Sequence, residues 1–507
     1  MNRPTTLAEL KQSGYRTRSV RDEMRQNLLR MIREGSKRWQ GIVAYEETVL
    51  PHVENAILAK QDFILLGLRG QAKTKILRLL TQFLDEYIPA LAGAPLNDDP
   101  FAPVSAEGKQ LITQQGGAAP IVWIPRDARY CEKLATPDVT ISDLIGDIDP
   151  IKAAGRGLSY ADEGAIHYGI IPRTNRGIFA INELPDLQPR IQVGLLNILE
   201  ERDIQIRGFP IRLPLDIVMV FSANPEDYTN RGNIITPLRD RIASQILTHY
   251  PPNVHAGMAI TIQEAWTDRG DGPKITVPMF LRETIESVAM EARASEFVNQ
   301  ASGVSARLTI ALLEQVVSNA ERRAIKFGLD SETARVCDLL ASAPAVSGKV
   351  ELVYEGEREG IEVVAHKLIG LGVRAVFDRT FPDALRSNAK KTPQAKAGAL
   401  ESAAADSGVF KSVVDWFGSG KSLIIDDATH PNEYNKSLRA IPGLQKTAEE
   451  YLANITEDEK AAAMEFVLEG LHQNSVLARS RVNGAVTYSD MVRSMLEGME
   501  FKKKKNS

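Results

Sequence analysis

The segment from Phe63 to Thr74 constrains the fold of this chain more than any other. An apolar run, Phe63–Leu66, has the length of a buried strand, and a loop with two glycines follows it before Lys73 and Thr74. The apolar residues after Thr74 recur at helical spacing. The sequence therefore predicts a strand, a glycine-bearing loop and a helix in direct succession. In that layout backbone N–H groups and a helix N-terminus surround a phosphate group.

The loop is predicted to bind the phosphates of a nucleotide. The residues expected to line them are Gly67, Gly70, Gln71, Ala72, Lys73 and Thr74. Lys73 would reach the β- and γ-phosphate oxygens, and Thr74 would coordinate Mg²⁺. Ala72 departs from the pattern, because glycine normally precedes the lysine and a Cβ resists positive φ. Taken alone, the segment also fits an ordinary strand–turn–helix that contains Lys-Thr.

Composition limits the class of protein. The chain has 507 residues, enough for about two to four domains, with 43% hydrophobic and 25% charged residues, as in soluble globular proteins. A net charge of −4 argues against a dedicated nucleic-acid binder. The two cysteines, Cys131 and Cys337, are far apart and lack metal-ligand spacing, which indicates a reducing compartment and no disulfide framework.

The termini and the hydropathy predict a cytoplasmic protein. The N-terminal residues lack the apolar core of a signal peptide, and no run approaches the roughly 20 apolar residues of a membrane span. The run Lys502–Lys505 is expected to be a solvated tail.

The expected fold class is α/β, with a parallel sheet flanked by helices. The strands are predicted from four apolar runs, Phe63–Leu66, Ile121–Ile124, Gly177–Ile181 and Ile217–Phe221. The predicted domains are a helical N-terminal extension (1–40), the α/β core (41–250), a helical lid (251–345) and a C-terminal region (346–507). The C-terminal region is expected to be mostly helical, with a flexible linker near 386–408 and a short strand at Leu423–Ile425.

Polar residues that follow two of these strands complete the predicted nucleotide site. Asn182 and Glu183 follow Gly177–Ile181. The first of the two is usually Asp, which holds a Mg²⁺-bound water, and the second polarises the attacking water. Asn182 is therefore expected to serve the metal as a weaker, uncharged acceptor, and Glu183 to act as general base. Asn224 would hold the water in line with the γ-phosphate. Polar residues that merely cap a strand are the structural alternative.

Two arginines are candidates for contact with the γ-phosphate. Arg241 lies in the segment Pro237–Ile242 and would stabilise transition-state charge on the ATP of a neighbouring subunit. Arg307 follows Gly303 at the start of a predicted helix and would report the presence of the phosphate. Either arginine alone is more commonly a surface ion-pair partner, so the case depends on the order and spacing of all five motifs.

With these motifs the chain resembles the AAA+ ATPases, and among them the magnesium-chelatase I-subunit and MoxR-like branch. The resemblance covers residues from about 45 to 325. Leu144–Pro150 with Gly164–Ile171 resembles the insert in the second helix of that branch. Leu195–Arg202 with Ile204–Gly208 resembles the helix and β-hairpin before the first sensor.

The resemblance implies a P-loop AAA+ core that uses ATP and Mg²⁺. It implies that Asn224 is the first sensor, Arg241 the arginine finger and Arg307 the second sensor. It also implies a ring of copies, expected to be a hexamer, and a protein partner, which in relatives commonly carries a von Willebrand A-type domain. The implied role is chaperone-like, in the remodelling, maturation or metal loading of that partner. The hydropathy predicts no membrane partner, and the net charge argues against a nucleic-acid partner.

Other functions are compatible with parts of the sequence. Ala72 and Asn182 can leave nucleotide binding intact with negligible hydrolysis, which would give a nucleotide-gated scaffold; the presence of Glu183, Asn224 and Arg241 argues against it. An enhancer-binding transcriptional activator would need a Gly-Ala-Phe-Thr-Gly-Ala loop and a C-terminal helix-turn-helix, and neither is found in the sequence. A literal magnesium chelatase is not favoured, because nothing in the chain indicates a porphyrin substrate.

Two further segments are rejected as sites. Phe417–Ser422 resembles a phosphate loop, but Asp415 stands where the pattern requires glycine and the strand-like Leu423–Ile425 follows. A Gly-Ser turn between two short strands is the interpretation preferred here. His167 has no Cys, Asp or Glu at metal-ligand spacing and is expected to be an exposed polar residue.

Overall fold

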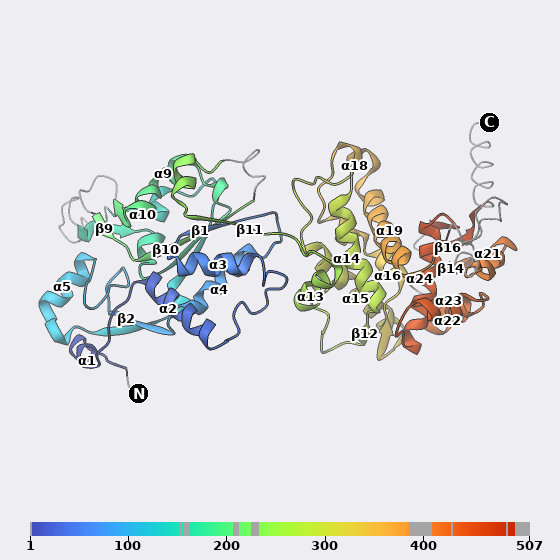
Figure 1. The fold of residues 1–507 in the computed structure, drawn as a ribbon, viewed down its shortest axis with the longest axis horizontal. Coiled ribbons are helices and arrows are strands. Elements are labelled where there is room, and N and C mark those ends of the chain that lie inside the picture. Colours follow the sequence, from blue (N-terminus) through green and yellow to red (C-terminus); the bar gives the residue numbers. More distant parts are fainter. Residues whose placement is uncertain are drawn as a thin grey trace, which may run out of the picture. The chain divides into compact units, whose positions relative to one another are not determined.

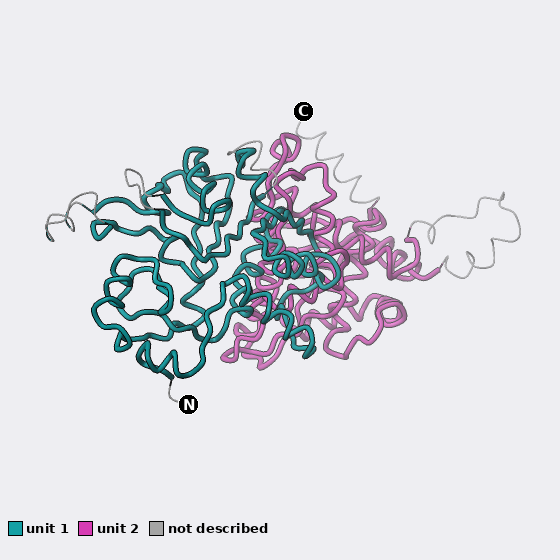
Figure 2. The backbone as a smooth tube through the Cα atoms, turned by 60° about the vertical axis from the view of Figure 1, so that its left-hand side comes forward, with its two compact units in different colours: residues 1–250 teal, residues 251–507 magenta. Residues whose placement is uncertain are grey.

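The computed structural model describes residues 3–149, 151, 155, 163–205, 212–224, 233–384, 408–426, 429–482 and 485–491. The chain forms two compact units, residues 1–250 and 251–507, which Figure 2 colours separately and which are described here one at a time. The domain boundaries expected at 40 and 345 stay predictions. The linker expected near 386–408 lies, except for Gly408, outside the described residues.

Unit 1 is built on a five-stranded parallel sheet (Figure 1). Its strands, in spatial order, are β11 (Ser244–Leu247), β1 (Phe63–Leu66), β10 (Ile217–Ala223), β7 (Gly177–Asn182) and β4 (Tyr130–Leu134). Every pairing is parallel. The three central strands are buried along their whole length, as expected for strands with helices on both faces. The predicted α/β fold, with a parallel sheet flanked by helices, is confirmed.

The two faces of the sheet carry separate hydrophobic clusters, since successive side chains of a strand point to opposite faces. Phe63 and Leu65 pack with one cluster, and Ile64 and Leu66 with the other. The first face is covered by α2 (Val20–Arg33), α3 (Val49–Leu58) and α4 (Lys73–Leu79). The second is covered by α9 (Pro189–Gly194), α10 (Leu196–Glu200) and α12 (Thr236–Arg241). The N-terminal helical segment thus packs on the core through α2.

One of the four predicted strands lies outside the central sheet. The run at Ile121–Ile124 forms β3 (Ile121–Pro125), but β3 pairs antiparallel with β2 (Tyr87–Leu91) and not with the central sheet. Its Ile121 packs against α1 (Leu7–Gln12), while Val122 is 45% exposed. The prediction that this run belongs to the parallel sheet is therefore wrong, because an apolar run indicates a strand without fixing its partner.

Smaller elements surround the core of unit 1. They are α5 (Ala106–Gln115), α6 (Ile141–Leu144), β5 (Gly146–Ile148), β6 (Ile166–Tyr168), α8 (Ile170–Arg173), β8 (Asp203–Gln205) and β9 (Arg212–Pro214). β5 and β6 pair antiparallel within the predicted insert, and β8 and β9 form the predicted hairpin. Residue 150 and residues 206–211 of these segments lie outside the described part of the chain.

Unit 2 is mainly helical. Its helices are α13 (Val254–Glu264), α14 (Met279–Ala294), α15 (Arg307–Phe327), α16 (Val336–Ala341), α17 (Ala343–Ser347), α18 (Tyr354–Glu359), α19 (Ile361–Thr380), α21 (Lys411–Gly418), α22 (Pro431–Arg439), α23 (Leu444–Tyr451) and α24 (Lys460–Gln473). Its strands are β12 (Lys274–Thr276), β13 (Ser331–Thr333), β14 (Leu423–Ile425), β15 (Leu477–Val482) and β16 (Ala485–Asp490). β12 and β13 pair in parallel, and the other three form an antiparallel sheet in the order β14-β16-β15.

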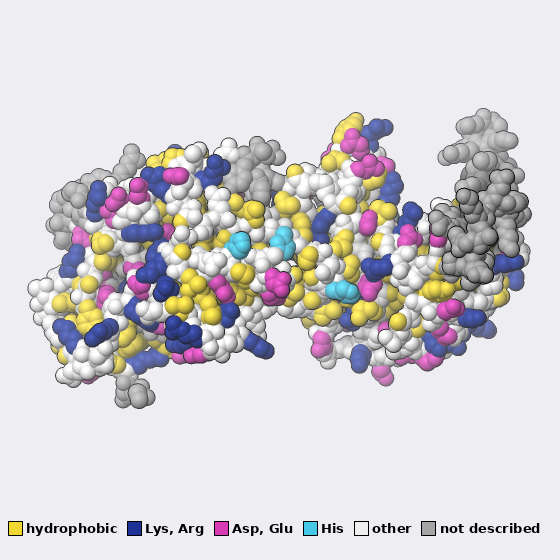
Figure 3. All heavy atoms as spheres, in the orientation of Figure 1, with side chains coloured by type: hydrophobic (Ala, Val, Ile, Leu, Met, Phe, Trp, Pro, Cys, Tyr) yellow, Lys and Arg dark blue, Asp and Glu magenta, His cyan; other side chains and the backbone are white. Residues whose placement is uncertain are grey.

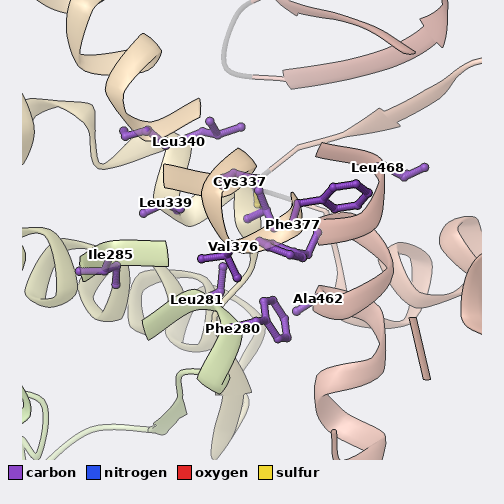
Figure 4. Packing of buried hydrophobic residues seen from close by; sticks show 14 of the residues in the cluster. Phe280, Leu281, Ile285, Cys337, Leu339, Leu340, Val376, Phe377, Ala462 and Leu468 are labelled. Carbon is purple, nitrogen blue, oxygen red and sulfur yellow. The ribbon is translucent and has the colours of Figure 1, made fainter. Parts of the chain in front are cut away.

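A single hydrophobic cluster runs through unit 2. Figure 4 shows Phe280 of α14, Phe377 of α19 and Ala462 of α24 among its members. The residues on the two sides of position 345 therefore share one core.

The rejected loop at Phe417–Ser422 follows a helix. Residues up to Gly418 form α21, in which Val413 and Phe417 are buried one turn apart, and β14 comes after the turn. The predicted strand Leu423–Ile425 is confirmed, but the expectation of a turn between two strands is wrong, because the buried i, i+4 pair makes the preceding segment helical.

Charged side chains of both signs are interspersed on the face shown in Figure 3. Among the helices that the structure describes, none is both long enough and apolar enough to cross a membrane. Within the same residues, no group of three or more His, Cys, Asp or Glu side chains is placed to hold a metal ion.

Candidate nucleotide-binding site

The candidate site lies where three adjacent strands of the central sheet end. β1 lies beside β10, with Leu66 opposite Ala223, and β10 lies beside β7, with Phe221 opposite Ile181. Because the three strands are parallel, the loop after β1 and the polar residues that end β10 and β7 meet at one edge. The described structure thus brings the three strand-end motifs of the sequence together.

A chain of hydrogen bonds joins one residue from each motif. Lys73, only 7% exposed, donates from Nζ to the Oδ1 atom of Asn224 at 2.5 Å, to the carbonyl of Leu68 at 3.0 Å and to the carbonyl of Gly67. Asn224, also 7% exposed, donates from Nδ2 to Oε2 of Glu183 at 3.0 Å. The Asn224 amide therefore bridges the ammonium group and the carboxylate, using its oxygen for one and its nitrogen for the other.

Ser222 holds the two polar residues at the end of β7. Its hydroxyl donates to Oδ1 of Asn182 at 3.0 Å and accepts the backbone N–H of Glu183 at 3.3 Å. Glu183 has φ 55° and ψ 51°, in the left-handed region that non-glycine residues rarely adopt. Ser222 is 1% exposed and was not among the predicted site residues, because a serine inside an apolar run gives no signal of its own.

The phosphate loop packs closely against the chain after β11. A Cβ at Gly67 would lie 1.9 Å from Oγ1 of Thr248 and 2.1 Å from Oε1 of Gln71, so only glycine fits this position. Thr248 donates to Gln71 Oε1 at 2.6 Å. The hydroxyl of Tyr45 donates to the carbonyl of Gln71 at 3.1 Å and to that of His249 at 2.7 Å, and burial raises the pKa of Tyr45 to about 12. That hydroxyl therefore remains a proton donor at neutral pH.

Two residues of the loop have positive φ. Gly70 has φ 74°, and Ala72 has φ 55° and ψ 13° where it precedes α4. The left-handed conformation costs a residue with a Cβ about 1–2 kcal/mol relative to its preferred regions. Ala72 thus adopts the backbone that the glycine of the usual pattern would adopt, and the surrounding contacts offset the cost.

The residues predicted to serve Mg²⁺ supply neutral oxygens. Thr74 is the second residue of α4 and is half-buried, and the side-chain oxygen of Asn182 already accepts from Ser222. Mg²⁺ is usually held by one or two carboxylates together with phosphates and waters. Glu183 is the carboxylate that follows Asn182, so this set fits a metal bound mainly through the phosphates of a nucleotide.

The two arginines make hydrogen bonds with residues of their own units. Arg241 ends α12, where its Nε donates to Oε2 of Glu200 at 2.7 Å and its side chain is 30% exposed. Arg307 is the first residue of α15 in unit 2, where it is exposed and its backbone N–H donates to Ser305 Oγ at 3.1 Å. Their predicted roles stay predictions.

Comparisons with known proteins give distant likenesses. No family model matches the chain. The hydrogenase transcriptional regulatory protein HoxA of Cupriavidus necator is 29% identical over 93 residues, which are 18% of this chain and only 19% of that protein.

Solved structures resemble longer parts of the chain. A structure of the complex between the BchI and BchD subunits of magnesium chelatase matches with a TM-score of 0.32 and 20% identity, over 63% of this chain and 97% of the other. NtrX from Brucella abortus matches with a TM-score of 0.30 and 13% identity, over 62% of this chain and 55% of the other. The closed state of Hsp104 with ATPγS and casein matches with a TM-score of 0.37 and 13% identity, over 61% and 50%. TM-scores and sequence identities this low carry no argument about the core of unit 1. The α/β fold of that core is therefore assigned from its own strand order.

Proposed function

We propose that this chain is an ATP-binding and ATP-hydrolysing AAA+ ring protein of the magnesium-chelatase I-subunit and MoxR-like kind. Its work would be to remodel or mature a partner protein, with metal insertion as one form of that work. The observation that supports the proposal most is the hydrogen-bonded chain from Lys73 through Asn224 to Glu183 at the carboxyl ends of β1, β10 and β7.

Each member of that chain has chemistry that suits ATP hydrolysis. Lys73 would supply a buried positive charge to the phosphates, and among its acceptors are carbonyl and amide oxygens that phosphate oxygens can replace. Glu183 would take a proton from a water, and Asn224 would orient that water. Thr74 and Asn182 would hold Mg²⁺, which neutralises charge on the phosphates when bound.

We propose a ring because Arg241 of one copy would have to reach the phosphates of the ATP bound by a neighbouring copy. Arg241 is paired with Glu200, whose side chain is 54% exposed, and such an exposed ion pair contributes only about 0–1 kcal/mol. Arg241 can therefore leave Glu200 at little cost when a neighbouring copy presents its nucleotide. A site completed by a neighbour requires an oligomer with closed symmetry, for which we propose a hexamer.

The test is steady-state ATP hydrolysis with Mg²⁺ across a range of protein concentrations. Wild-type turnover per subunit should rise as the ring assembles, and Lys73→Ala and Glu183→Gln should abolish it. Mixing inactive Glu183→Gln with inactive Arg241→Ala should restore part of the turnover, because some sites then receive an intact Glu183 and a neighbour's intact Arg241. Absence of any recovery in the mixture would contradict an arginine supplied by a second copy.

A nucleotide-gated scaffold is the second candidate function. It is favoured by Ala72 in a left-handed conformation and by the uncharged Asn182 at the metal position. Nucleotide binding by the wild type with no turnover at any protein concentration would establish the scaffold and reject the hydrolytic proposal.

A further inference from the structure

A cavity of about 480 Å³ lies within unit 2, outside the nucleotide site. It is bounded by α13, by the segment 267–273, by β12 and by α15 (Figure 1 labels these elements). Its apolar lining includes Val277, Leu313 and Val317, each at most 5% exposed. Polar and charged residues line the rest of the cavity, and cavities that bind ligands are commonly of this size, with apolar walls and a few polar groups.

The cavity is also lined by cations, two of which have no ion pair within the described residues. Arg269 is neutralised by its ion pair with Glu321. By contrast, the guanidinium of Arg282 makes a single hydrogen bond within the described residues, from Nε to the carbonyl of Val277 at 3.0 Å. The ammonium of Lys274, another lining residue, has no ion pair or hydrogen bond in the same part of the chain. Both η nitrogens of Arg282 thus remain for an acceptor, in the fork geometry that matches a carboxylate.

The rim of the cavity exposes apolar side chains. Ile262, which lines it, is 46% exposed. Trp266 is 64% exposed and lies 4.9 Å below the guanidinium of the lining Arg269. Met279, 59% exposed, is three residues before Arg282 on α14 and therefore on the same side of that helix. Trp, Met and Arg are the residue types enriched in the centres of protein–protein interfaces.

We propose that this cavity, named here the Arg282 pocket, binds an acidic–apolar peptide segment of a partner protein. One large apolar side chain of that segment would enter between Ile262, Val277 and Leu313, and an adjacent Asp or Glu would pair with Arg282 and Lys274. Asp268 also lines the cavity, so beyond the Arg269–Glu321 pair the lining carries two cations and one carboxylate, and this excess of positive charge favours an acidic partner. The proposal depends on unit 2 alone and requires neither nucleotide binding nor hydrolysis.

The test is selection of random peptides displayed on phage against the full-length protein. Selected peptides should pair Asp or Glu with a large apolar residue. Synthetic peptides made from them should bind in fluorescence anisotropy. Arg282→Glu should weaken that binding at least tenfold, and Ile262→Ser should weaken it several-fold. Added salt should also weaken it, because the pairing lies near the surface.

The matched control is Arg358→Glu, a charge reversal at an exposed residue of α18 that does not line the cavity. It should leave peptide affinity within twofold, and all variants should keep the thermal unfolding temperature and the nucleotide binding of the wild type. Three outcomes overturn the proposal: no peptide is selected, the selected peptides lack acidic residues, or Arg282→Glu and Arg358→Glu weaken binding equally. A change of the peptide glutamates to glutamine that leaves affinity unaltered would also overturn it.

Discussion

Each unit buries a group of charged and polar side chains, but the two groups are enclosed differently. In unit 1, Lys73, Asn224 and Glu183 lie at the end of a sheet, beside a loop of backbone with positive φ. In unit 2, Arg323 and Asp338, at 2% and 0% exposure, lie between helices α15 and α16.

The two groups also differ in their hydrogen-bond acceptors. Arg323 donates to both carboxylate oxygens of Asp338, at 2.5 and 2.8 Å, so each charge has its opposite. Lys73 lies at a loop, and its acceptors include carbonyl and amide oxygens, which a more strongly charged ligand can displace. The comparison teaches that a buried charge enclosed between two helices serves stability, whereas a buried charge at a loop beside a strand end is accessible to a ligand.

The largest expected effect tests the unit 1 group. Glu183→Gln should lower the turnover of ATP by about 10²–10⁴-fold, since the amide cannot accept the proton of the attacking water. Nucleotide affinity and the unfolding temperature should change little, because glutamine has the same shape. The exposed Glu86 provides the control, and Glu86→Gln should keep full turnover. Equal loss in both variants would mean that Glu183 has no special role.

The second prediction tests the unit 2 group. Asp338→Ala should lower the free energy of unfolding by about 3–5 kcal/mol, because it removes the carboxylate that both η nitrogens of the buried Arg323 contact and leaves only the longer ion pair with Glu332 at 3.3 Å. Urea unfolding of unit 2 measures this, and nucleotide binding by unit 1 in native buffer should be unchanged. The exposed Asp330 is the control, and Asp330→Ala should change the free energy by less than about 0.5 kcal/mol. A small effect of Asp338→Ala would remove the proposed difference between the two groups.

The third prediction is a dependence on pH located in unit 2. Glu465 of α24 is fully buried and accepts hydrogen bonds from Tyr434 and from the backbone N–H groups of Val336 and Cys337. Burial raises the pKa of Glu465 from 4.5 to about 7, although the hydrogen bond from Tyr434 opposes the rise. The folded protein therefore binds a proton that the unfolded chain has already released.

The sign of the dependence follows from that proton. The contribution of Glu465 to stability is fully present below pH 4.5 and is lost as the pH rises towards 7, by roughly 3 kcal/mol in total. The free energy of unfolding of the wild type, minus that of Glu465→Gln, should fall across this interval. A difference that is constant with pH would show that Glu465 is ionised in the folded protein.

The smallest expected effect returns to the loop of unit 1. Ala72→Gly should stabilise the protein by less than about 1 kcal/mol, since relief of the left-handed Cβ is largely offset by the greater freedom of glycine in the unfolded chain. Thermal unfolding measures the change, with an Ala-to-Gly substitution at Ala59, which has φ −81°, as control. Ala59→Gly should destabilise, and destabilisation of equal size at Ala72 would contradict the strain assigned there.

The sequence predicts the centre of the sheet and fails at its edges. β1, β7 and β10 are fully buried and therefore appear as continuous apolar runs. β4 has the sequence Tyr-Cys-Glu-Lys-Leu and β11 the sequence Ser-Gln-Ile-Leu, because an edge strand is partly exposed and needs no such run. Neither β4 nor β11 was predicted from the sequence, because neither strand forms a continuous apolar run.

In the candidate site, too, some residues belong to local sequence patterns, whereas others are brought in from distant parts of the chain. The residues that end strands or open helices, such as Lys73 and Glu183, belong to local patterns and were predicted by position. Ser222, Thr248 and Tyr45 support them from elsewhere in the chain, through contacts that no local pattern records. The pairing of Arg241 with Glu200 was likewise invisible, because it joins residues 41 positions apart.

The tight fit around Gly67 connects the loop to the way the chain leaves unit 1. Thr248 and His249 are among the last three residues of that unit, and they are joined to Gln71 directly or through Tyr45. On the function proposed above, a movement of the loop would pull on the backbone that continues into residue 251, and a pull on that backbone would move the loop. Mechanical force would then pass between the phosphate loop and the second half of the chain along the polypeptide itself.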